Sequence, residues 1–396
     1  MKILVLNAGS SSVKFSLYES DGEKMLAKGL IERINAPNTA MRYSNFRGQK
    51  IEKDISANSY EAAISEACLA LVETTYGVIT NLCEIEGIGH RVVHGGADIT
   101  ASSRITPNIK QIIMDCFSLA PLHNPPNYEC IEACEHLFPN VPMVAVFDTA
   151  FHQTMPSAAY TYAIPAEIAV KNKIRRYGFH GTSHQYVSGR AAEILGRPPT
   201  ELKLITAHLG NGSSIAAVNH GKVEDTSMGM TPLEGLVMGT RCGDIDPAVV
   251  LTLRRIGYNL EDIDKILNKQ SGLLGVAGIG SNDMRDILKA IESGNPGAQL
   301  ALDVFVHRLV KYIGAYAAVL NGFDALVFTA GIGENVPRVR AMVCEKLSYL
   351  GVQLDAARNK AGELLISKDG TSPAVLVVPT DEELMIVRDT VRLLAS

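Results

Sequence analysis

The N-terminal residues place a short glycine- and serine-rich break between two apolar stretches. Residues 3–6 (ILVL) form a continuous apolar run, which predicts a buried strand. Residues 13–18 (VKFSLY) alternate between apolar and polar positions, which predicts a half-buried strand. We therefore expect residues 7–12 (NAGSSS) to form the tip of a β-hairpin. Such a tip is either a solvated turn or a phosphate cradle of backbone N–H groups and hydroxyls.

The same pattern returns about half a chain later. Residues 204–207 (LITA) lead into 208–214 (HLGNGSS), and 215–218 (IAAV) follow. Each copy continues to a tight turn, at Asp21–Gly22 and at His220–Gly221. Two unrelated surface turns have no reason to share this order of elements. The repeat therefore favours two duplicated domains, each with its own phosphate cradle.

Helical and strand patterns alternate along the rest of the chain, which predicts an α/β fold with helices packed on mixed sheets. Helical spacing is found over residues 58–76, 183–195, 301–320 and 383–394. Strand-like apolar runs are found over residues 141–147, 325–329 and 375–378. We expect the segments 148–156 and 379–382 to connect the two halves.

Composition narrows the class of protein. The chain has 396 residues, enough for two domains, with 46% hydrophobic and 20% charged residues. The net charge of -5 argues against a nucleic-acid-binding protein. We find neither a membrane span nor a signal peptide, and we expect a cytoplasmic protein. Its seven cysteines contain no C-x-x-C pair and fit free thiols, and Cys130 and Cys134 lie one helical turn apart.

The chain contains neither a P-loop motif nor a G-x-G-x-x-G motif after a strand, so the candidate chemistry lies elsewhere. Arg91, in GHRVVHGG (89–96), and Arg241, in GTRCGD (239–244), lie among glycines. Glycines let a backbone approach a ligand closely, and arginine binds carboxylate or phosphate with two hydrogen bonds. A surface salt bridge is the alternative for each arginine.

Three histidines lie in rigid or turn-forming segments. His123 is held in the proline-rich loop PLHNPPN (121–127). His180 and His184 have a spacing that can bind zinc on a helix, but the glutamate of H-E-x-x-H is absent. We expect no zinc there, because Gly181 favours a turn. Thr182 or Ser183 is expected to cap the following helix and to leave His180 in the turn.

Acidic residues follow the predicted strands. Asp148 ends the apolar run 141–147, where a carboxylate faces either a ligand site or a backbone cap. Asp283 and Arg285 follow a glycine-rich run, and GIGEN (331–335) is expected to open a helix that suits a ribose or adenine. Thr380 and Glu383 fit a capping box, which leaves Glu382 free to bind Mg²⁺ together with Asn7.

With these motifs the sequence resembles the acetate kinase family, which also contains propionate and butyrate kinases. Further matching motifs are VAVFDTAFH (144–152), RRYGFHGTSH (175–184), DTSMGMTPLEGLVMGTRCGD (225–244) and PTDEE (379–383). The resemblance covers essentially the whole chain. It implies two duplicated actin/hexokinase-like (ribonuclease H-like) domains with a nucleotide cleft between them. The implied domains are 1–150 plus 383–396 for the acyl substrate, and 151–382 for the nucleotide and for dimerisation.

The resemblance also implies an activity: reversible transfer of a phosphoryl group from ATP to acetate, giving ADP and acetyl phosphate. It implies Mg²⁺, with Mn²⁺ as an alternative, and a homodimer without nucleic-acid or membrane partners. The implied catalytic residues are Asp148, His180, Arg241 and His123, and the metal residues are Asn7 and Glu382. The implied acyl-substrate residues are Arg91, Val93, Leu122, Phe179 and Pro232. The implied ATP residues are Lys14, His208, Leu209, Gly210, Asn211, Gly212, Asp283, Met284, Arg285, Gly331, Ile332, Gly333, Glu334 and Asn335.

Two positions depart from the resembled family, whose members usually carry Asn at the position of Asp381 and commonly Ser at that of Cys242. Asp381 adds a negative charge beside the expected metal site, and Cys242 adds a thiol beside Arg241. Members that prefer propionate often carry Ala at the position of Val93, so a propionate kinase is the nearest alternative. A non-catalytic actin-like ATP-binding protein is the alternative from another class. Such a protein has no reason to combine two arginines and two histidines with a small apolar pocket.

Overall fold

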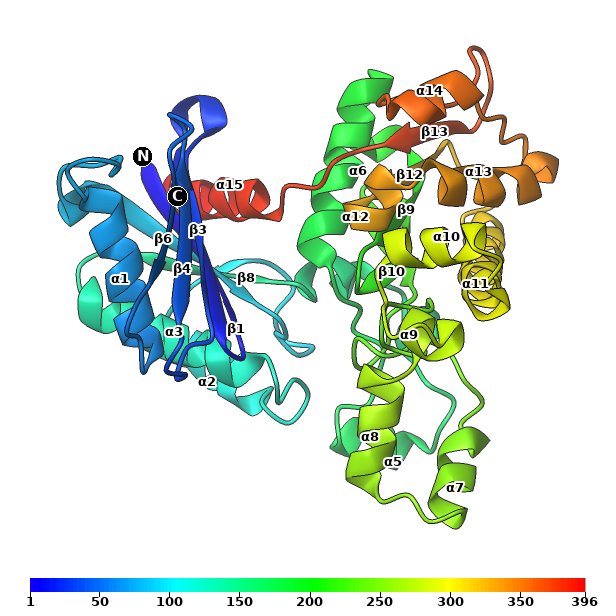
Figure 1. The fold of residues 1–396 in the computed structure, drawn as a ribbon, viewed down its shortest axis with the longest axis horizontal. Helices are drawn as coiled ribbons and strands as arrows, with labels where there is room; N and C mark the ends of the chain where they lie inside the picture. The colour runs from blue at the N-terminus through cyan, green and yellow to red at the C-terminus, as the bar shows by residue number, and fades with distance from the viewer. Residues whose placement is uncertain (396) are drawn as a thin grey trace. The chain divides into compact units, whose positions relative to one another are not determined.

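The chain folds into two compact units. The computed structural model describes residues 1–395. Unit 1 combines Met1–Phe151 with the C-terminal segment from Asp381, and unit 2 comprises His152–Thr380. The predicted boundaries, after residues 150 and 382, lie close to these crossing points. Each unit has one β-sheet with helices packed on it, so the predicted α/β class is confirmed (Figure 1).

Unit 1 is built on an eight-stranded sheet in the order β5-β4-β3-β2-β1-β6-β8-β7. Its strands are β1 (Lys2–Gly9), β2 (Ser12–Glu19), β3 (Lys24–Glu32), β4 (Ala40–Asn45), β5 (Lys50–Asp54), β6 (Ile85–Val92), β7 (Ser103–Arg104) and β8 (Met143–Phe147). Its helices are α1 (Tyr60–Val72), α2 (Pro107–Asp115), α3 (Asn124–Leu137) and α15 (Glu382–Ala395). Strands β1, β6 and β8 are parallel, so their carboxyl ends meet at one edge of the sheet.

The two faces of this sheet are covered by different helices. Leu4 and Leu6 of β1 pack in one core cluster with residues of α1 and α3. On the other face α15 approaches β6 closely, because β6 has glycine at positions 87 and 89. A Cβ atom at Gly89 would lie 2.5 Å from Cγ2 of Ile386 and 2.6 Å from Oγ1 of Thr390. The glycines therefore set the distance between α15 and the sheet.

Unit 2 contains a five-stranded sheet in the order β11-β10-β9-β12-β13. Its strands are β9 (Lys203–Leu209), β10 (Ser213–Asn219), β11 (Lys222–Thr226), β12 (Ala325–Thr329) and β13 (Ala374–Val377). Its helices are α4 (Ser157–Tyr160), α5 (Ala166–Lys171), α6 (Gly181–Leu195), α7 (Ala248–Arg255), α8 (Leu260–Lys269), α9 (Gly272–Ala277), α10 (Met284–Glu292), α11 (Pro296–Val319), α12 (Ala330–Asn335), α13 (Pro337–Lys346) and α14 (Ala356–Ala361).

The two sheets have the same topology, which confirms the predicted duplication. The central strands of unit 1, β3-β2-β1-β6-β8, correspond one by one to β11-β10-β9-β12-β13 of unit 2. In both units the first three strands pair antiparallel, as β1-β2-β3 and β9-β10-β11. A fourth strand, β6 or β12, pairs in parallel with the first strand, and β8 or β13 pairs in parallel with the fourth. The predicted hairpin tips lie at Ser10–Ser11 and Gly210–Gly212.

Each half of the chain supplies one helix to the sheet of the other half. Helix α6 follows β8 in the chain and packs on β9 and β12, whereas α15 follows β13 and packs on β1, β6 and β8. Helix α11 covers the opposite face of the second sheet with Phe305, Leu309 and Ile313. Between Met1 and Ala395 we find no helix that combines the length and the apolar character needed to cross a membrane.

We expect Gly89→Ala to destabilise unit 1 by about 1–3 kcal/mol, because overpacking forces α15 away from β6. Gly189→Ala is the matched control, because no atom lies within 4 Å of a Cβ at that position in α6. Alanine is the better helix former, so this control is expected to be neutral or to stabilise by up to about 1 kcal/mol. Urea unfolding of both variants measures the difference. Equal stability of the two variants would contradict the close packing of α15.

Candidate active site

Three predicted residues of unit 1 meet at the carboxyl ends of β1, β6 and β8. Arg91 donates from Nε to Oδ1 of Asp148 (3.1 Å) and from Nη2 to Oδ2 (2.5 Å), and its Nη1 donates to Oδ1 of Asn7 (3.2 Å). Asp148 is almost fully buried. This fork-shaped pairing fixes the guanidinium plane of Arg91, so the carboxylate of Asp148 serves to orient the arginine.

Glu382, the first residue of α15, adds a carboxyl group to this cluster. Burial raises its pKa to about 7; the positive charge of Arg91 opposes this shift, while the charges of Asp148 and Glu383 add to it. For Arg91, burial alone would lower the pKa, but Asp148, Glu382 and Glu383 raise it above its ordinary value. Lys14 lies directly across the hairpin from Asn7. When Glu382 is ionised, the three carboxylates of Asp148, Glu382 and Glu383 outnumber the two cations, Arg91 and Lys14.

The predicted capping box at the start of α15 is wrong by one residue. Asp381, not Thr380, caps the helix, because its Oδ1 accepts a hydrogen bond of 2.8 Å from the backbone N–H of Leu384. The hydroxyl of Thr380 instead contacts that of Ser183. Glu383 consequently lies at the second helical position and has no capping role. The extra carboxylate at position 381 thus has a structural function.

Two asparagines that the sequence analysis did not select hold the loop after β6. Asn127 accepts a hydrogen bond from the backbone N–H of Val93 (3.1 Å) and donates to the carbonyl of Ala8 (2.8 Å). Asn124 accepts from the N–H of His94. Both asparagines are buried in the first turn of α3 and belong to the PLHNPPN motif. The motif therefore ties the hairpin of β1 to the segment that contains Val93.

The predicted acyl-substrate residues other than Arg91, and His123, have different environments. Val93 is buried, whereas the side chain of Leu122 is 58% exposed. His123 occupies the N-cap position of α3 with a non-helical backbone. Phe179 is buried and Pro232 is half-buried, and both belong to unit 2. The predicted acyl-pocket residues are therefore divided between the two units.

In unit 2, His180 lies against the second hairpin. Its ring stacks on that of His208, with centroids 4.2 Å apart, and its Nδ1 contacts Oγ of Ser214 at 2.9 Å. His180 itself occupies the N-cap position of α6 in a left-handed conformation, so the prediction of Thr182 or Ser183 as the cap is wrong. His184 contacts Thr206 and Ser214 from the buried face of α6. Burial lowers the pKa of His184 well below its ordinary value, and His152 and His208 add to the shift.

Arg241 is a half-buried cation beside the same hairpin. A Cβ atom at Gly212 would lie 3.4 Å from Nη1 of Arg241 and 3.4 Å from Nε2 of His180. Nη1 donates to the carbonyl of Pro232 (3.2 Å), and within residues 1–395 Arg241 forms no ion pair. Burial lowers its pKa. A cation of this kind is suited to an anionic ligand.

The hairpin tip is joined to two further predicted segments. The carbonyl of Asn211 accepts from the N–H of Gly239 (2.9 Å), and its side-chain oxygen accepts from Nδ2 of Asn282 (2.5 Å). The next residue, Asp283, caps α10 and pairs with Arg285. The structure therefore brings residues 208–212, 239–241 and 282–285 together. The side chains of Leu209 and Met284 belong to the core of unit 2.

The GIGEN segment opens helix α12, as predicted, at the carboxyl end of β12. It also lies next to β9, because a Cβ atom at Gly333 would be 3.7 Å from the carbonyl oxygen of Ala207. Glu334 folds back, and its Oε1 accepts from the N–H groups of Ala330 (2.8 Å) and Thr380 (3.2 Å). The carboxylate of Glu334 therefore holds the backbone in place.

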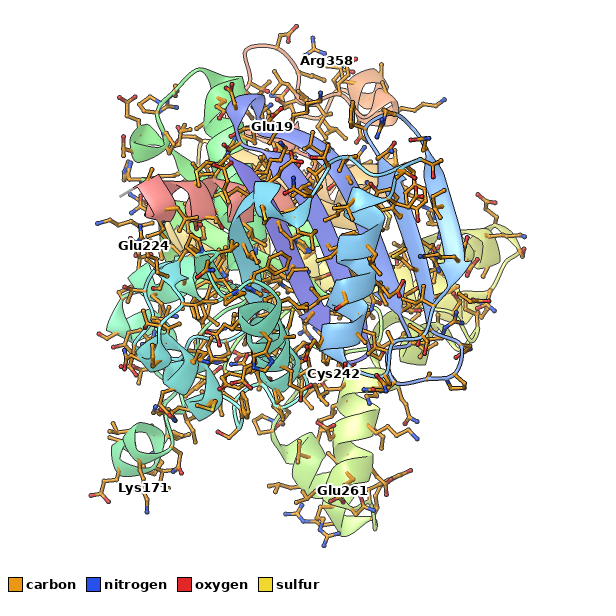
Figure 2. All side chains as sticks on the ribbon, turned by 90° about the vertical axis from the view of Figure 1, so that its left-hand side faces the viewer. Glu19, Lys171, Glu224, Cys242, Glu261 and Arg358 are labelled. Carbon is orange, nitrogen blue, oxygen red and sulfur yellow. The ribbon has the colours of Figure 1, made fainter. Side chains whose placement is uncertain are left out.

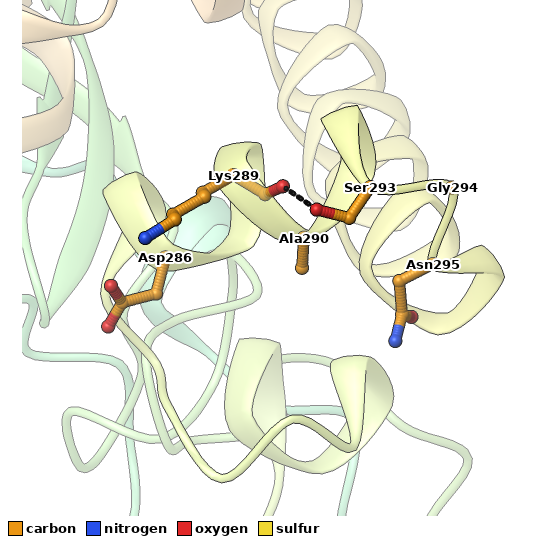
Figure 3. A pocket seen from close by; sticks show the side chains of 6 residues that line it. All are labelled: Asp286, Lys289, Ala290, Ser293, Gly294 and Asn295. Carbon is orange, nitrogen blue, oxygen red and sulfur yellow. Dashed lines mark hydrogen bonds between the residues drawn. The ribbon is translucent and has the colours of Figure 1, made fainter.

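A shallow pocket in unit 2 lies outside the predicted ATP residues. It is lined by Asp286, Lys289, Ala290, Ser293, Gly294 and Asn295, at the end of α10 and the start of α11 (Figure 3). Ser293 donates to the carbonyl of Lys289 there (3.1 Å). None of these six residues is among those that the sequence analysis selected, but Asp286 directly follows the predicted ATP residue Arg285 in the first turn of α10, so the pocket adjoins that segment.

Comparisons with known proteins identify the family. The family model described as the Acetokinase family matches residues 2–388. The chain belongs to this family. An acetate kinase of Alkaliphilus metalliredigens is 52% identical over 395 residues, which is 98% of this chain and 99% of the relative.

Two solved structures resemble the whole chain. The acetate kinase of Porphyromonas gingivalis has a TM-score of 0.96 and 45% identity, covering 99% of both chains. A propionate kinase from Francisella tularensis has a TM-score of 0.93 and 46% identity, again covering 99% of both chains. Both kinds of acetokinase are therefore similar to this chain to about the same degree.

The cluster of unit 1 fits the divalent metal ion that an acetokinase uses with ATP. Asn7 and Glu382 supply side-chain oxygen atoms, which are the ligands that hard divalent cations prefer. The raised pKa of Glu382 comes first from burial, with the neighbouring carboxylates adding to it. A nearby divalent cation would favour the ionised form of Glu382. The donor set and its charge therefore both suit such an ion.

The second departure of this acetokinase is Cys242, a half-buried thiol beside Arg241. Its Sγ donates to the carbonyl of Gly243 (3.1 Å), and burial raises its pKa. Because the thiolate is the nucleophilic form, a raised pKa lowers the reactivity of the thiol at neutral pH. Cys242 is labelled in Figure 2.

We expect Asp381→Ala to destabilise the protein by about 0.5–2 kcal/mol, because the N-terminus of α15 loses its cap. Asp381→Asn keeps an accepting oxygen and is expected to retain most of the stability. Glu383→Ala serves as the control at a neighbouring position and is expected to have the smaller effect. Thermal unfolding of the three variants measures the differences. A larger loss for Glu383→Ala would restore the capping box centred on Thr380.

Proposed function

We propose that this protein is an ATP:acetate phosphotransferase that forms acetyl phosphate and ADP reversibly. The observation that carries the proposal is Arg241, a half-buried cation without an ion pair within residues 1–395, next to the glycine tip of a phosphate hairpin and to His180. The oriented guanidinium of Arg91, in the other unit, supports an acceptor that is itself an anion.

The chemistry of the acceptor explains this choice of residues. A small carboxylic acid is ionised at neutral pH, so it needs no general base to become a nucleophile. The obstacle is the repulsion between the carboxylate and the anionic phosphate chain. Catalysis by this chain therefore consists of positioning and charge neutralisation, which is the pattern of phosphoryl transfer.

We assign the roles accordingly. Arg91 binds the acyl carboxylate and Asp148 orients Arg91, while Val93, Leu122, Phe179 and Pro232 bound the methyl group. His180 and Arg241 stabilise the transferring phosphoryl group, with His123 assisting. Asn7 and Glu382 hold Mg²⁺, which neutralises phosphate charge when it is bound. Lys14 and the segments 208–212, 283–285 and 331–335 bind ATP.

We further propose that the protein acts as a homodimer in the cytoplasm. Helices α5, α7 and α8 extend away from the sheet of unit 2 in both views, as the labels of Lys171 and Glu261 show (Figures 1 and 2). They expose several large apolar side chains: Ile168, Val170, Leu251, Ile256 and Leu260. Exposed apolar groups of this size are typical of an interface, and a second copy of the chain is the partner that the family resemblance implies. All seven cysteines are free thiols, as expected in a reducing compartment.

We expect Arg241→Ala and Arg91→Ala each to lower kcat about 10²-fold or more in the acetyl hydroxamate assay with ATP, acetate and hydroxylamine. Arg91→Ala should also destabilise the fold by several kcal/mol, because it leaves buried Asp148 without its partner. Arg42→Ala, an exposed arginine paired with Glu32, is the control and should behave like the native protein. Near-native turnover of folded Arg241→Ala would refute the assignment.

A second candidate is propionate, because a propionate kinase is among the similar structures. Val93 is buried and β-branched, so a longer acyl chain would have to displace a stiff side chain. We expect acetate to be preferred over propionate, with butyrate poor. One methylene in such a pocket changes transition-state binding by about 1–3 kcal/mol, or 10- to 200-fold.

We therefore expect Val93→Ala to narrow or reverse the preference for acetate while the KM for ATP changes little. The measurement is kcat/KM for acetate, propionate and butyrate on both proteins. An unchanged ratio in Val93→Ala would show that Val93 does not set the size of the pocket. A native preference for propionate would replace acetate as the substrate.

A further inference from the structure

One buried cluster in unit 1 has no part in the proposed phosphotransfer. His90 of β6 and Cys130 and Cys134 of α3 each offer one ligand atom, and these three atoms lie within 4.8 Å of one another. All three side chains are at most 1% exposed. Nε2 of His90 is buried and has no hydrogen bond of ordinary length among residues 1–395, although the ring interacts with the thiol of Cys130. A ligand bound by His90 and both thiols would give this buried nitrogen a strong partner, and burying it without one costs free energy.

We propose that His90, Cys130 and Cys134 bind a Zn²⁺ ion inside unit 1. Two cysteines and one histidine are a protein ligand set that holds zinc together with a fourth, non-protein ligand. In a tetrahedral zinc site with zinc–sulfur bonds of about 2.3 Å, two sulfur ligands lie about 3.8 Å apart. The three ligand atoms lie within 4.8 Å of one another in the structure, so side-chain rotations that bring them closer by up to about 1 Å complete the site.

The helix excludes the simplest alternative, a disulfide. Cys130 and Cys134 are four residues apart in α3, where Cβ atoms are separated by about 5–6 Å. A disulfide needs Cβ atoms about 3.5–4.5 Å apart, so it would distort the helix. A metal ion spans the longer distance and leaves α3 intact.

Charge and ligand type select zinc among the common divalent ions. The cluster lies in an apolar core that includes Leu6 and Ile88. Zn²⁺ with two thiolates and a neutral imidazole has no net charge, so its burial avoids the large cost of an isolated ion. Mg²⁺ and Ca²⁺ prefer oxygen ligands and do not suit sulfur.

The location of the cluster gives the ion a structural role. His90 precedes Arg91 in β6, and α3 also provides Asn124 and Asn127, which hold the backbone of His94 and Val93. Zinc at this position would fasten α3 to β6 behind the acyl-binding residues. It is separate from the metal ion that Asn7 and Glu382 are proposed to bind with ATP.

The first experiment measures the zinc content of the full-length protein after growth in zinc-supplemented medium and dialysis against a weak chelator. We expect about one zinc per chain, and near zero in the double variant Cys130→Ser/Cys134→Ser. Cys116→Ser removes another buried cysteine of unit 1 that is in no disulfide, and it is expected to retain the zinc. Native protein without zinc, or equal loss in Cys116→Ser, would overturn the proposal.

A second measurement does not depend on the folding of a variant. Native protein produced in cobalt-supplemented medium should show a thiolate-to-cobalt charge-transfer band and the visible bands of tetrahedral Co²⁺. Their absence in folded native protein would also overturn the proposal. We further expect removal of zinc by a strong chelator to lower the Tm of the native protein but not that of the double variant. An equal fall in both would mean that zinc acts elsewhere in the chain.

Discussion

The parallel pairing of β1, β6 and β8 is the constraint on which the acyl-binding half of the site depends. Because these strands run in the same direction, the residues at their carboxyl ends are neighbours although they are far apart in the sequence. Asn7, Arg91 and Asp148 occupy these ends. The guanidinium of Arg91 compensates the buried charge of Asp148, and the resulting pair presents an oriented cation to an anionic substrate. Without this register the two charges would each remain unpaired.

Duplication places a related arrangement in unit 2, but the second copy has a different chemistry. The hairpin of β9 and β10 corresponds to that of β1 and β2, and both have glycine at or next to the tip. Around the second tip lie Arg241 and His180, without a carboxylate partner for the arginine within residues 1–395. In unit 1 the guanidinium of Arg91 is paired with and oriented by Asp148, whereas Arg241 of unit 2 has no ion pair within residues 1–395 and is proposed to bind the phosphate chain. This asymmetry suits a reaction between two anions.

Helix α15 links the candidate active site of unit 1 to the stability of the fold. Helix α15 packs on the sheet of unit 1 and begins with Glu382, so the close contact with Gly89 also sets the position of the carboxyl group that we propose as a metal ligand. Asp381 caps this helix, and Thr380 is held by Glu334 and Ser183 of unit 2. A substitution that loosens α15 is therefore expected to lower stability and to disturb the proposed metal site.

Local patterns in the sequence were sufficient for the hairpins, the duplication, the α/β class and the family, because each depends on short-range periodicity or on motifs of neighbouring residues. Most predicted elements were found, with ends shifted by a few residues. Only the tertiary structure determines which side chains cap the helices and which hold the loop backbone in place. His180 rather than Thr182 or Ser183 occupies the N-cap position of α6. Asp381 rather than Thr380 caps α15, because the hydroxyl of Thr380 is engaged by that of Ser183, far away in the sequence. The roles of Asn127 and of His90 beside Cys130 likewise arise only when α3 packs against the sheet, since no spacing in the sequence encodes contacts between residues so far apart.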